Sequence, residues 1–399
     1  MDLSLALLRR GYHALAEERG RHDDADTFAA RLLGRHALVL RGADGARVFY
    51  DTERVSRVGS VPPPLAGLIF GSGAMHGLDG REHDVRKHLF LDVLDDEAVE
   101  RLVAVVAERL RDRLVESAGR EVDLFALLVE VYGDSVLRWA GVPSHERQRS
   151  SLARQMAAIV DGFGGSPRAY ARGWAARAHL DRWAGRLVAA QRRSGRTGDA
   201  TPLARIASLP VPARTAGVEL LNLLRPTVAV AWPATWAVVE LLRDADLAAQ
   251  VRGSAGELVR RRVAHEVRRV RPFVPALAGR ARIAFTHDGL SVRPGDRLVL
   301  DVVGTDTDPA HWSAPDRFDP QRFTDAEPDA YAFVPQGGGC PRNGHRCPGE
   351  PLTVRIVEAT LEEVGRYDLV SGDPELPDQP MTRMPRRPGP TGRLVLTAR

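Results

Sequence analysis

Apolar residues recur at helical spacing through the middle of the chain. Between residues 81 and 270 they repeat every three to four positions, which is typical of helices with one buried face. An eighth helix is predicted close to the C-terminal end, at residues 348–366. The seven helices predicted before it cover residues 81–94, 96–118, 121–141, 144–162, 168–193, 213–243 and 254–271. The first twenty residues have the spacing of an amphipathic helix and lack the long apolar run of a signal peptide.

Strand-like alternation is confined to the two ends of the chain. Residues 36–50, HALVLRGADGARVFY, predict a strand, a glycine-containing turn and a helix. Residues 281–304 alternate apolar and polar positions around Asp-Gly and Pro-Gly turn signals. No linker or low-complexity segment divides the sequence. The prediction is therefore one mainly α-helical domain over residues 1–399, with small peripheral β-sheets.

The most apolar segment, residues 220–242, has the length of a membrane span. It contains Arg225 and two prolines, and no second span accompanies it, so we expect a buried central helix and no membrane span. Pro226 removes a backbone N–H and frees the carbonyl of Asn222, which predicts a kink at that position.

Composition narrows the class of protein further. The formal net charge is +4, and nearly all basic residues are arginine, with Lys87 the single lysine. Acidic residues are interleaved with the arginines, so the basic bias does not predict a nucleic-acid-binding face. The two cysteines, Cys340 and Cys347, do not make a disulfide framework, which favours a reducing cytoplasm.

The strongest local signal is the loop FVPQGGGCPRNGHRCPGE at residues 333–350. Cys347 is followed by Pro348 and then by Glu350, where an amphipathic run begins, so the cysteine is predicted at the N-terminal end of a helix. Oriented N–H groups at a helix N-terminus favour a thiolate over a thiol. Glycines earlier in the loop allow the backbone to approach a large flat ligand closely.

Two other interpretations of this loop stay open on the residues alone. The first is a helix that happens to begin after a cysteine. The second is a metal site made by Cys340, His345 and Cys347, which has three ligands and lacks the Cys-x-x-Cys spacing of structural zinc sites. A covalently attached c-type haem is excluded because Cys-x-x-Cys-His does not occur.

Two segments before the loop complete a pattern. Glu266 and Arg269 are three residues apart on a predicted helix, where they can pair. Residues 304–323 then contain Pro-Asp-x-Phe-x-Pro-x-Arg-Phe. This order of Glu-x-x-Arg, the turn-rich segment and the cysteine loop resembles the cytochrome P-450 superfamily. The resemblance implies a haem b (iron protoporphyrin IX) cofactor with Cys347 as its axial ligand, and a structural ion pair of Glu266 and Arg269 with Arg322 nearby.

The cysteine loop departs from most of the superfamily because Phe333 lies fourteen residues before Cys347. In this respect it resembles the fatty-acid peroxygenase branch, whose loops contain PQGGG and, after a few variable residues, GHRCPGE. Here these motifs are residues 335–339 and 344–350, and Cys340 lies in the variable part.

The predicted distal helix supports the same branch. A lone arginine in an apolar helix is costly to bury without an anion, so Arg225 either reaches the surface, pairs with a buried acid or holds an anionic ligand. The segment ELLNLLRPTVAVA at residues 219–231 resembles the branch, where this Arg-Pro pair holds the substrate carboxylate. That resemblance implies catalytic roles for Arg225 and Pro226.

Further site residues follow from the same resemblance. Phe70 and His76 match the substrate-loop positions, and a histidine with a pKa near neutrality can donate a proton; a hydrogen-bonded loop histidine without a catalytic part is the alternative. Four basic side chains match or neighbour positions that reach the haem propionates, with surface solvation as the alternative for each: Arg57, His83, Lys87 and His345. The bulky pair Trp232-Pro233 leaves the length of the substrate open.

The implied activity is hydrogen-peroxide-dependent oxidation of a fatty acid. The substrate carboxylate acts as the acid–base group, and the products are 2- or 3-hydroxy acids or, after decarboxylation, terminal alkenes. No reductase is required. Two other functions remain: a monooxygenase that depends on redox partners, and a haem-binding protein without catalysis.

Overall fold

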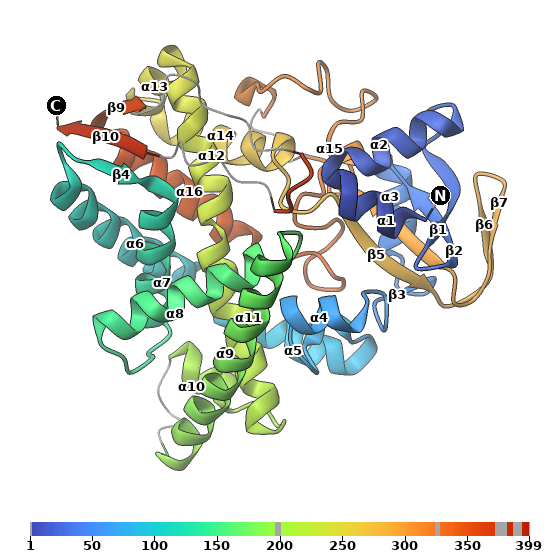
Figure 1. The fold of residues 1–399 in the computed structure, drawn as a ribbon, viewed down its shortest axis with the longest axis horizontal. Helices are drawn as coiled ribbons and strands as arrows, with labels where there is room; N and C mark the ends of the chain where they lie inside the picture. Colours follow the sequence, from blue (N-terminus) through green and yellow to red (C-terminus); the bar gives the residue numbers. More distant parts are fainter. Residues whose placement is uncertain (1, 196–200, 324–327, 372–380, 386–392, 399) are drawn as a thin grey trace.

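The computed structural model describes residues 2–195, 201–323, 328–371, 381–385 and 393–398. Helices make up most of the molecule (Figure 1). Their bounds are α1 (Leu3–Arg10), α2 (Ala14–Arg19), α3 (Gly42–Tyr50), α4 (Pro63–Ile69), α5 (Gly80–Val93), α6 (Asp96–Ser117), α7 (Leu124–Trp139), α8 (Glu146–Asp161), α9 (Pro167–Arg193), α10 (Pro202–Ala207), α11 (Ala213–Ala229), α12 (Ala231–Arg243), α13 (Ala245–Arg252), α14 (Gly256–Val270), α15 (Val302–Asp306) and α16 (Glu350–Val364).

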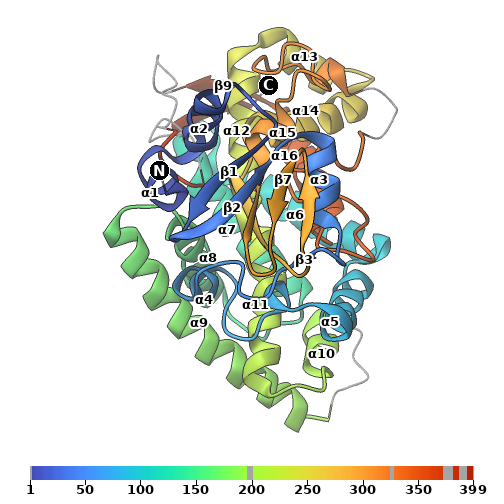
Figure 2. The same ribbon diagram turned by 90° about the vertical axis from the view of Figure 1, so that its right-hand side faces the viewer.

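The strands form three small sheets at the periphery of the helices. Their bounds are β1 (Thr27–Leu32), β2 (Arg35–Leu40), β3 (Val55–Ser56), β4 (Glu121–Asp123), β5 (Ala276–Ala281), β6 (Phe285–His287), β7 (Leu290–Val292), β8 (Arg297–Asp301), β9 (Tyr367–Ser371) and β10 (Arg393–Ala398). The largest sheet has the order β1-β2-β8-β5-β3, with β2 and β8 parallel and the other pairs antiparallel. Figure 2 views the molecule from the side on which this sheet lies. The other sheets are β4-β10-β9 and the hairpin β6-β7.

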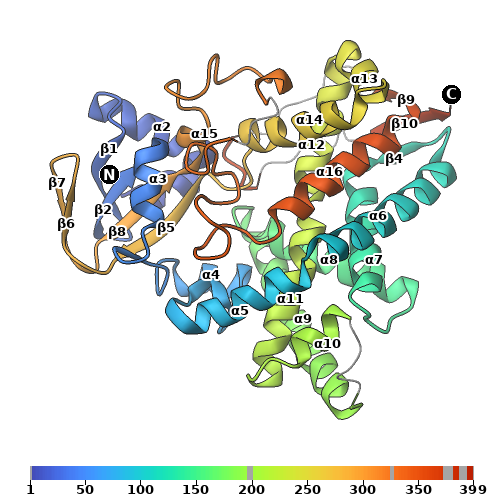
Figure 3. The same cartoon turned by 180° about the vertical axis from the view of Figure 1, so that it is seen from behind.

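The distal helices α11 and α12 run through the middle of the helical part and are buried almost throughout. Helices α7, α8 and α9 pack around α11, while α14 and α16 pack against α12. Figure 3 shows α16 lying along the helical body beside α6 and α12. One large apolar cluster is shared by these helices, so the central pair is fixed from several sides. The prediction of a mainly helical fold with small peripheral sheets is confirmed.

The predicted helix at 121–141 begins later than its apolar pattern indicates. Residues 121–123 form β4 and pair with residues 393–395 of β10, a contact between distant parts of the sequence. The side chain of Asp123 then accepts the Ala126 N–H at 2.9 Å and starts α7. Periodicity alone does not report a strand of three residues that is paired so far along the chain.

The predicted helix at 213–243 is divided into two helices at Val230. Helix α11 passes through Pro226 without ending, and the division between the two helices lies four residues later. Pro233 has no N–H to donate to the Ala229 carbonyl, and the Val230 N–H turns to Thr227 at 3.2 Å. The second proline therefore accounts for the hydrogen bond that is missing at this division.

Among the described residues, no helix combines the length and the apolar character needed to cross a lipid bilayer. Residues 220–242 do not form such a helix, because Arg225 lies inside the segment and the break at Val230 divides it.

Candidate active site

Cys347 lies at the end of a glycine-rich loop that returns toward its own start. The Cys347 N–H donates to the Gln336 carbonyl at 2.9 Å, which holds the cysteine beside the PQGGG segment. Gly337 has φ +98°, and a Cβ atom there would lie 2.8 Å from the Tyr50 hydroxyl oxygen of α3. Glycine is therefore needed for the loop to close at this position.

Helix α16 begins at Glu350, so Pro351 and not Pro348 occupies its first turn. Burial raises the pKa of the Cys347 thiol, and this exceeds the opposing effects of the Gly349 N–H and the Lys87 ammonium. The helix N-terminus alone thus does not make the thiolate the favoured form, contrary to the argument from sequence.

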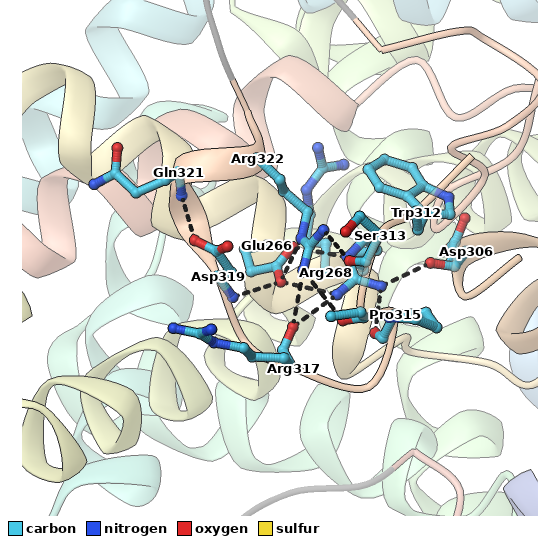
Figure 4. A network of polar contacts seen from close by, with 12 residues as sticks. Glu266, Arg268, Asp306, Trp312, Ser313, Pro315, Arg317, Asp319, Gln321 and Arg322 are labelled. Carbon is cyan, nitrogen blue, oxygen red and sulfur yellow. Dashed lines mark hydrogen bonds and ion pairs between the residues drawn. The ribbon is translucent and has the colours of Figure 1, made fainter. Parts of the chain in front are cut away.

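Glu266, Arg269 and Arg322 form one buried network. Figure 4 labels Glu266 and Arg322 within it. The Arg269 guanidinium donates to both oxygens of Glu266 at 2.8 Å, and Arg322 Nε donates to Glu266 Oε1 at 3.1 Å. Arg269 also donates to the carbonyls of Asp306, Pro315 and Arg317, which belong to the turn-rich segment. The network therefore ties α14 to the chain that leads to the cysteine loop.

Arg225 projects from α11 and is only 6% exposed, so it does not reach the surface. Within the described parts of the chain, no acid forms an ion pair with it. Burial, and secondarily the nearby Arg177, lowers the pKa of Arg225 to about 9. Two of the three interpretations from sequence, a surface arginine and an arginine paired with a buried acid, do not agree with this geometry. A buried guanidinium without a counter-ion is suited to an anionic ligand.

The next residue, Pro226, is exposed although it lies in the middle of a buried helix. Ala229 and Pro233 are partly exposed, and the spacing of these three positions puts them on one face of the distal helices. Cys347 and its neighbours are also partly exposed. The distal helices and the cysteine loop each leave a restricted surface accessible, as a bound cofactor requires.

Phe70 and His76 lie at the two ends of a loop between α4 and α5, and their rings stack with centroids 4.4 Å apart. The Nδ1 atom of His76 is buried and has no hydrogen-bond partner among the described residues. Burial lowers the pKa of His76 to about 3, with further contributions from Arg225 and Lys87. His76 is therefore neutral near pH 7, which removes the argument from sequence that its pKa lies near neutrality.

Three of the four predicted propionate contacts come together beside the cysteine loop. The His83 and His345 rings are 4.2 Å apart, and the Lys87 Nζ atom donates to the carbonyl of Arg346. Lys87 is 2% exposed, and burial lowers its pKa to about 8. Arg57 lies over the Phe49 ring and donates to the carbonyls of Phe49 and Ala278, close enough to lower the pKa of His345.

The alternative of a cysteine–histidine metal module does not agree with the structure. Cys340 is exposed on the loop, whereas Cys347 is only partly exposed. In the described part of the chain, no group of three His, Cys, Asp or Glu side chains is arranged to hold a metal ion.

Several residues that touch the site were not predicted from the sequence. Glu219 and Asn222 of α11 contact the Phe70–His76 loop, Arg86 of α5 pairs with Glu219, and Arg177 of α9 lies against Gly71. The available signal was Glu219 with Asn222, a polar pair at helical spacing in an otherwise apolar stretch.

The known proteins with similar sequences or structures are all cytochromes P450. The Cytochrome P450 family matches residues 259–364. Cytochrome P450 137 of Mycobacterium tuberculosis is 26% identical, over 93% of this chain and 83% of that protein. Cytochrome P450EX alpha with myristic acid is 32% identical with a TM-score of 0.92, and covers 100% of this chain and 98% of its own. Cytochrome P450SP alpha in complex with (R)-ibuprophen is 30% identical with a TM-score of 0.93, and the match covers 100% of this chain and 99% of that one. A variant of cytochrome P450 OleT in complex with arachidonic acid is 26% identical with a TM-score of 0.92, and the match covers 100% of this chain and 97% of that one.

The cofactor of these proteins is haem b held by a cysteine thiolate. The described residues fit it on three counts: a partly exposed cysteine at the end of the glycine-rich loop, an accessible stripe on the distal helices, and a cluster of basic side chains suited to two carboxylates. On full-length similarity above 30% identity, this chain belongs to the cytochrome P450 superfamily.

Proposed function

We propose that this protein is a fatty-acid peroxygenase, which uses hydrogen peroxide to hydroxylate a fatty acid at its α or β carbon and releases a terminal alkene where decarboxylation follows. The observation that carries the proposal is Arg225, a buried guanidinium with no acidic partner among the described residues, beside the accessible Pro226. A carboxylate is the ligand that such a fork binds in two parallel charge-assisted hydrogen bonds.

In this proposal Cys347 is the thiolate ligand, and Arg57, His83, Lys87 and His345 hold the propionates. Haem b, when bound, supplies the redox chemistry that cleaves the peroxide bond and oxidises a C–H bond. The two histidines are neutral in the protein as described, so Arg57 and Lys87 provide the positive charge and the histidines donate hydrogen bonds.

Among the described residues beside the loop, neither titratable group is suited to relay protons near pH 7. His76 is a weak base, because its pKa is lowered to about 3, and Glu219 is already engaged by three donors. The carboxylate held by Arg225 then takes the acid–base role: it accepts a proton from hydrogen peroxide and returns it to the leaving oxygen. Phe70, stacked on His76, forms the wall against which the chain near the carboxylate lies.

The test uses the haem-loaded protein with a saturated long-chain fatty acid and hydrogen peroxide, and products are identified by mass spectrometry. The wild type is expected to form hydroxy acids or alkene. Arg225→Ala should lower kcat/KM by at least about 100-fold, since two charge-assisted hydrogen bonds are lost. An unchanged Arg225→Ala variant, or a wild type without product, would contradict the proposal.

The two alternative functions predict different outcomes in the same assay. A conventional monooxygenase forms product with NAD(P)H and redox partners, and that turnover survives catalase. A non-catalytic haem protein shows a haem spectrum and no product under either condition.

The ligand assignment has its own measurement. Cys347→Ser should abolish the thiolate-type carbon monoxide difference spectrum, while Cys340→Ser should leave it unchanged, because Cys340 is exposed in the variable part of the loop. Loss of the spectrum in Cys340→Ser but not in Cys347→Ser would contradict the assignment of Cys347 as the ligand.

A further inference from the structure

The loop that carries Phe70 and His76 is fastened to the distal helix by a buried polar network outside the proposed carboxylate site. We call Glu219, Asn222 and Arg86 the loop clamp. Asn222 Nδ2 donates to the Phe70 carbonyl at 3.0 Å, and the Met75 N–H donates to Glu219 Oε1 at 2.9 Å. Both ends of the loop are thus bonded to α11.

Arg86 closes the clamp from α5. Its Nη1 atom donates to Glu219 Oε1 at 2.8 Å and to the Gly73 carbonyl at 2.5 Å. Asn222 Nδ2 also lies 3.3 Å from Glu219 Oε2, so the two side chains from α11 hold each other. The middle of the loop is therefore fixed as well as its two ends.

Burial makes the clamp sensitive to the loss of any member. Glu219 is 0% exposed, and burial raises the pKa of its carboxyl while Arg86 and Asn222 lower it. All of its neighbours in the clamp are donors, which suits an ionised, acceptor-only carboxylate. A buried charge of this kind is tolerated only with its partners in place. The loop backbone is one of these partners, so its position is coupled to that of Glu219.

The clamp lies in register with the proposed substrate site. Glu219, Asn222 and Pro226 are at positions i, i+3 and i+7, and share one face of α11. Arg225 is six residues after Glu219, about 9 Å further along the helix axis. The same helix thus carries both Arg225, the proposed carboxylate-binding side chain, and Glu219 and Asn222, which hold the loop. Gly71, with φ +86°, packs against Arg177 of α9 and confines the loop from a third side.

From these contacts we infer that Glu219 is a positioning residue. With Asn222 and Arg86 it fixes the stacked Phe70–His76 pair relative to Arg225, and thereby selects which carbon next to the carboxylate is oxidised. The inference rests on the proposed function. Its physical reason is that the α and β carbons are one bond apart, and displacements of about 1 Å are enough to change which reaction geometry is productive.

The experiment compares Glu219→Gln with wild type in the haem-loaded protein. Glutamine keeps the shape of the side chain but turns one acceptor into a donor, which opposes either the Met75 N–H, Arg86 or Asn222. Glu240→Gln is the matched control: Glu240 is also buried and also pairs with arginine, here Arg243 and Arg271, near the C-terminal end of α12. Haem content and far-UV circular dichroism establish that each variant is folded.

Two readouts are expected to change in Glu219→Gln only. Amide hydrogen exchange in residues 71–77 should rise about tenfold, as expected for a lost charged hydrogen bond. The ratio of α to β products should shift at least about threefold, whereas a purely structural role lowers the yield of both products together.

Each outcome decides the inference separately from the proposed function. Unchanged exchange in Glu219→Gln overturns the clamp, and raised exchange with an unaltered product ratio overturns its role in selection. If wild type forms no product, the proposed function fails. Selection of a carbon then fails with it, and only the positioning of the loop relative to Arg225 is decided, by the Soret shift on adding fatty acid. An apparent affinity altered in Glu219→Gln but not in Glu240→Gln supports the positioning, and equal affinities or no shift overturn it.

Discussion

Replacing Glu266 with glutamine should be among the most destabilising single changes in this protein. Glu266 is 0% exposed and accepts hydrogen bonds from Arg269, from Arg322 and from the Asp319 N–H at 2.8 Å. The substitution removes the charge that compensates two guanidinium groups and sets an NH2 group against at least one donor. Removing one partner of a buried pair costs about 3–5 kcal/mol, because the remaining charge is left uncompensated.

Denaturant unfolding of the haem-loaded protein, followed by far-UV circular dichroism and Soret absorbance, measures this loss. A double-mutant cycle with Arg269→Gln isolates the pair, and we expect a coupling of at least about 1.5 kcal/mol. The carbonyls that Arg269 also contacts remain unpaired in both Arg269 variants, so they cancel in the cycle. A cost below about 1 kcal/mol for Glu266→Gln, or additive effects in the cycle, would refute the reasoning.

Three further predictions concern stability. Gly71→Ala should cost roughly 1–3 kcal/mol, because the methyl group would overlap Arg177 at a positive φ. Gly73→Ala, also at positive φ but with only an ordinary van der Waals contact to Thr215, should cost less, and equal costs would contradict this. Burial lowers the pKa of His265 to about 3, so protons bind the unfolded chain first as the pH falls below about 6.5. Stability should therefore fall less steeply between pH 6 and pH 4 in His265→Gln, by up to about 1.4 kcal/mol per pH unit, in urea titrations at each pH. Tyr132→Phe removes a buried hydroxyl 2.6 Å from a threonine hydroxyl and should cost about 1 kcal/mol in the same assay.

The sequence was most informative where chemistry and local structure coincide. The order of Glu266, Arg269 and the Cys347 loop can be read along the chain, because each motif is short and contains unusual residue types. Arg225 could be singled out for a similar reason, since a charge inside an apolar helix has few explanations. The extent of the helical part followed from periodicity alone.

What could not be predicted depends on contacts between distant residues. The Met75 N–H meets a carboxylate 144 positions away, and three residues before α7 form a strand only because β10 returns to them. The neutral state of His76 follows from burial by neighbouring elements, which no local pattern reports. The pKa of the Cys347 thiol was misjudged for the same reason: the helix N-terminus is visible in the sequence, and the degree of enclosure is not.

Lys87 gives this protein an unusual reactivity toward amine reagents. It is the single lysine of the sequence, and its side chain is buried beside the Cys347 loop. Acylating labels will therefore find no lysine on the folded surface, and attachment can be directed to the α-amino group of the chain. Because burial lowers the pKa of Lys87 to about 8, an appreciable share of the amine is uncharged at mildly basic pH. The rate at which Lys87 is slowly modified then measures how often the protein opens around the cofactor.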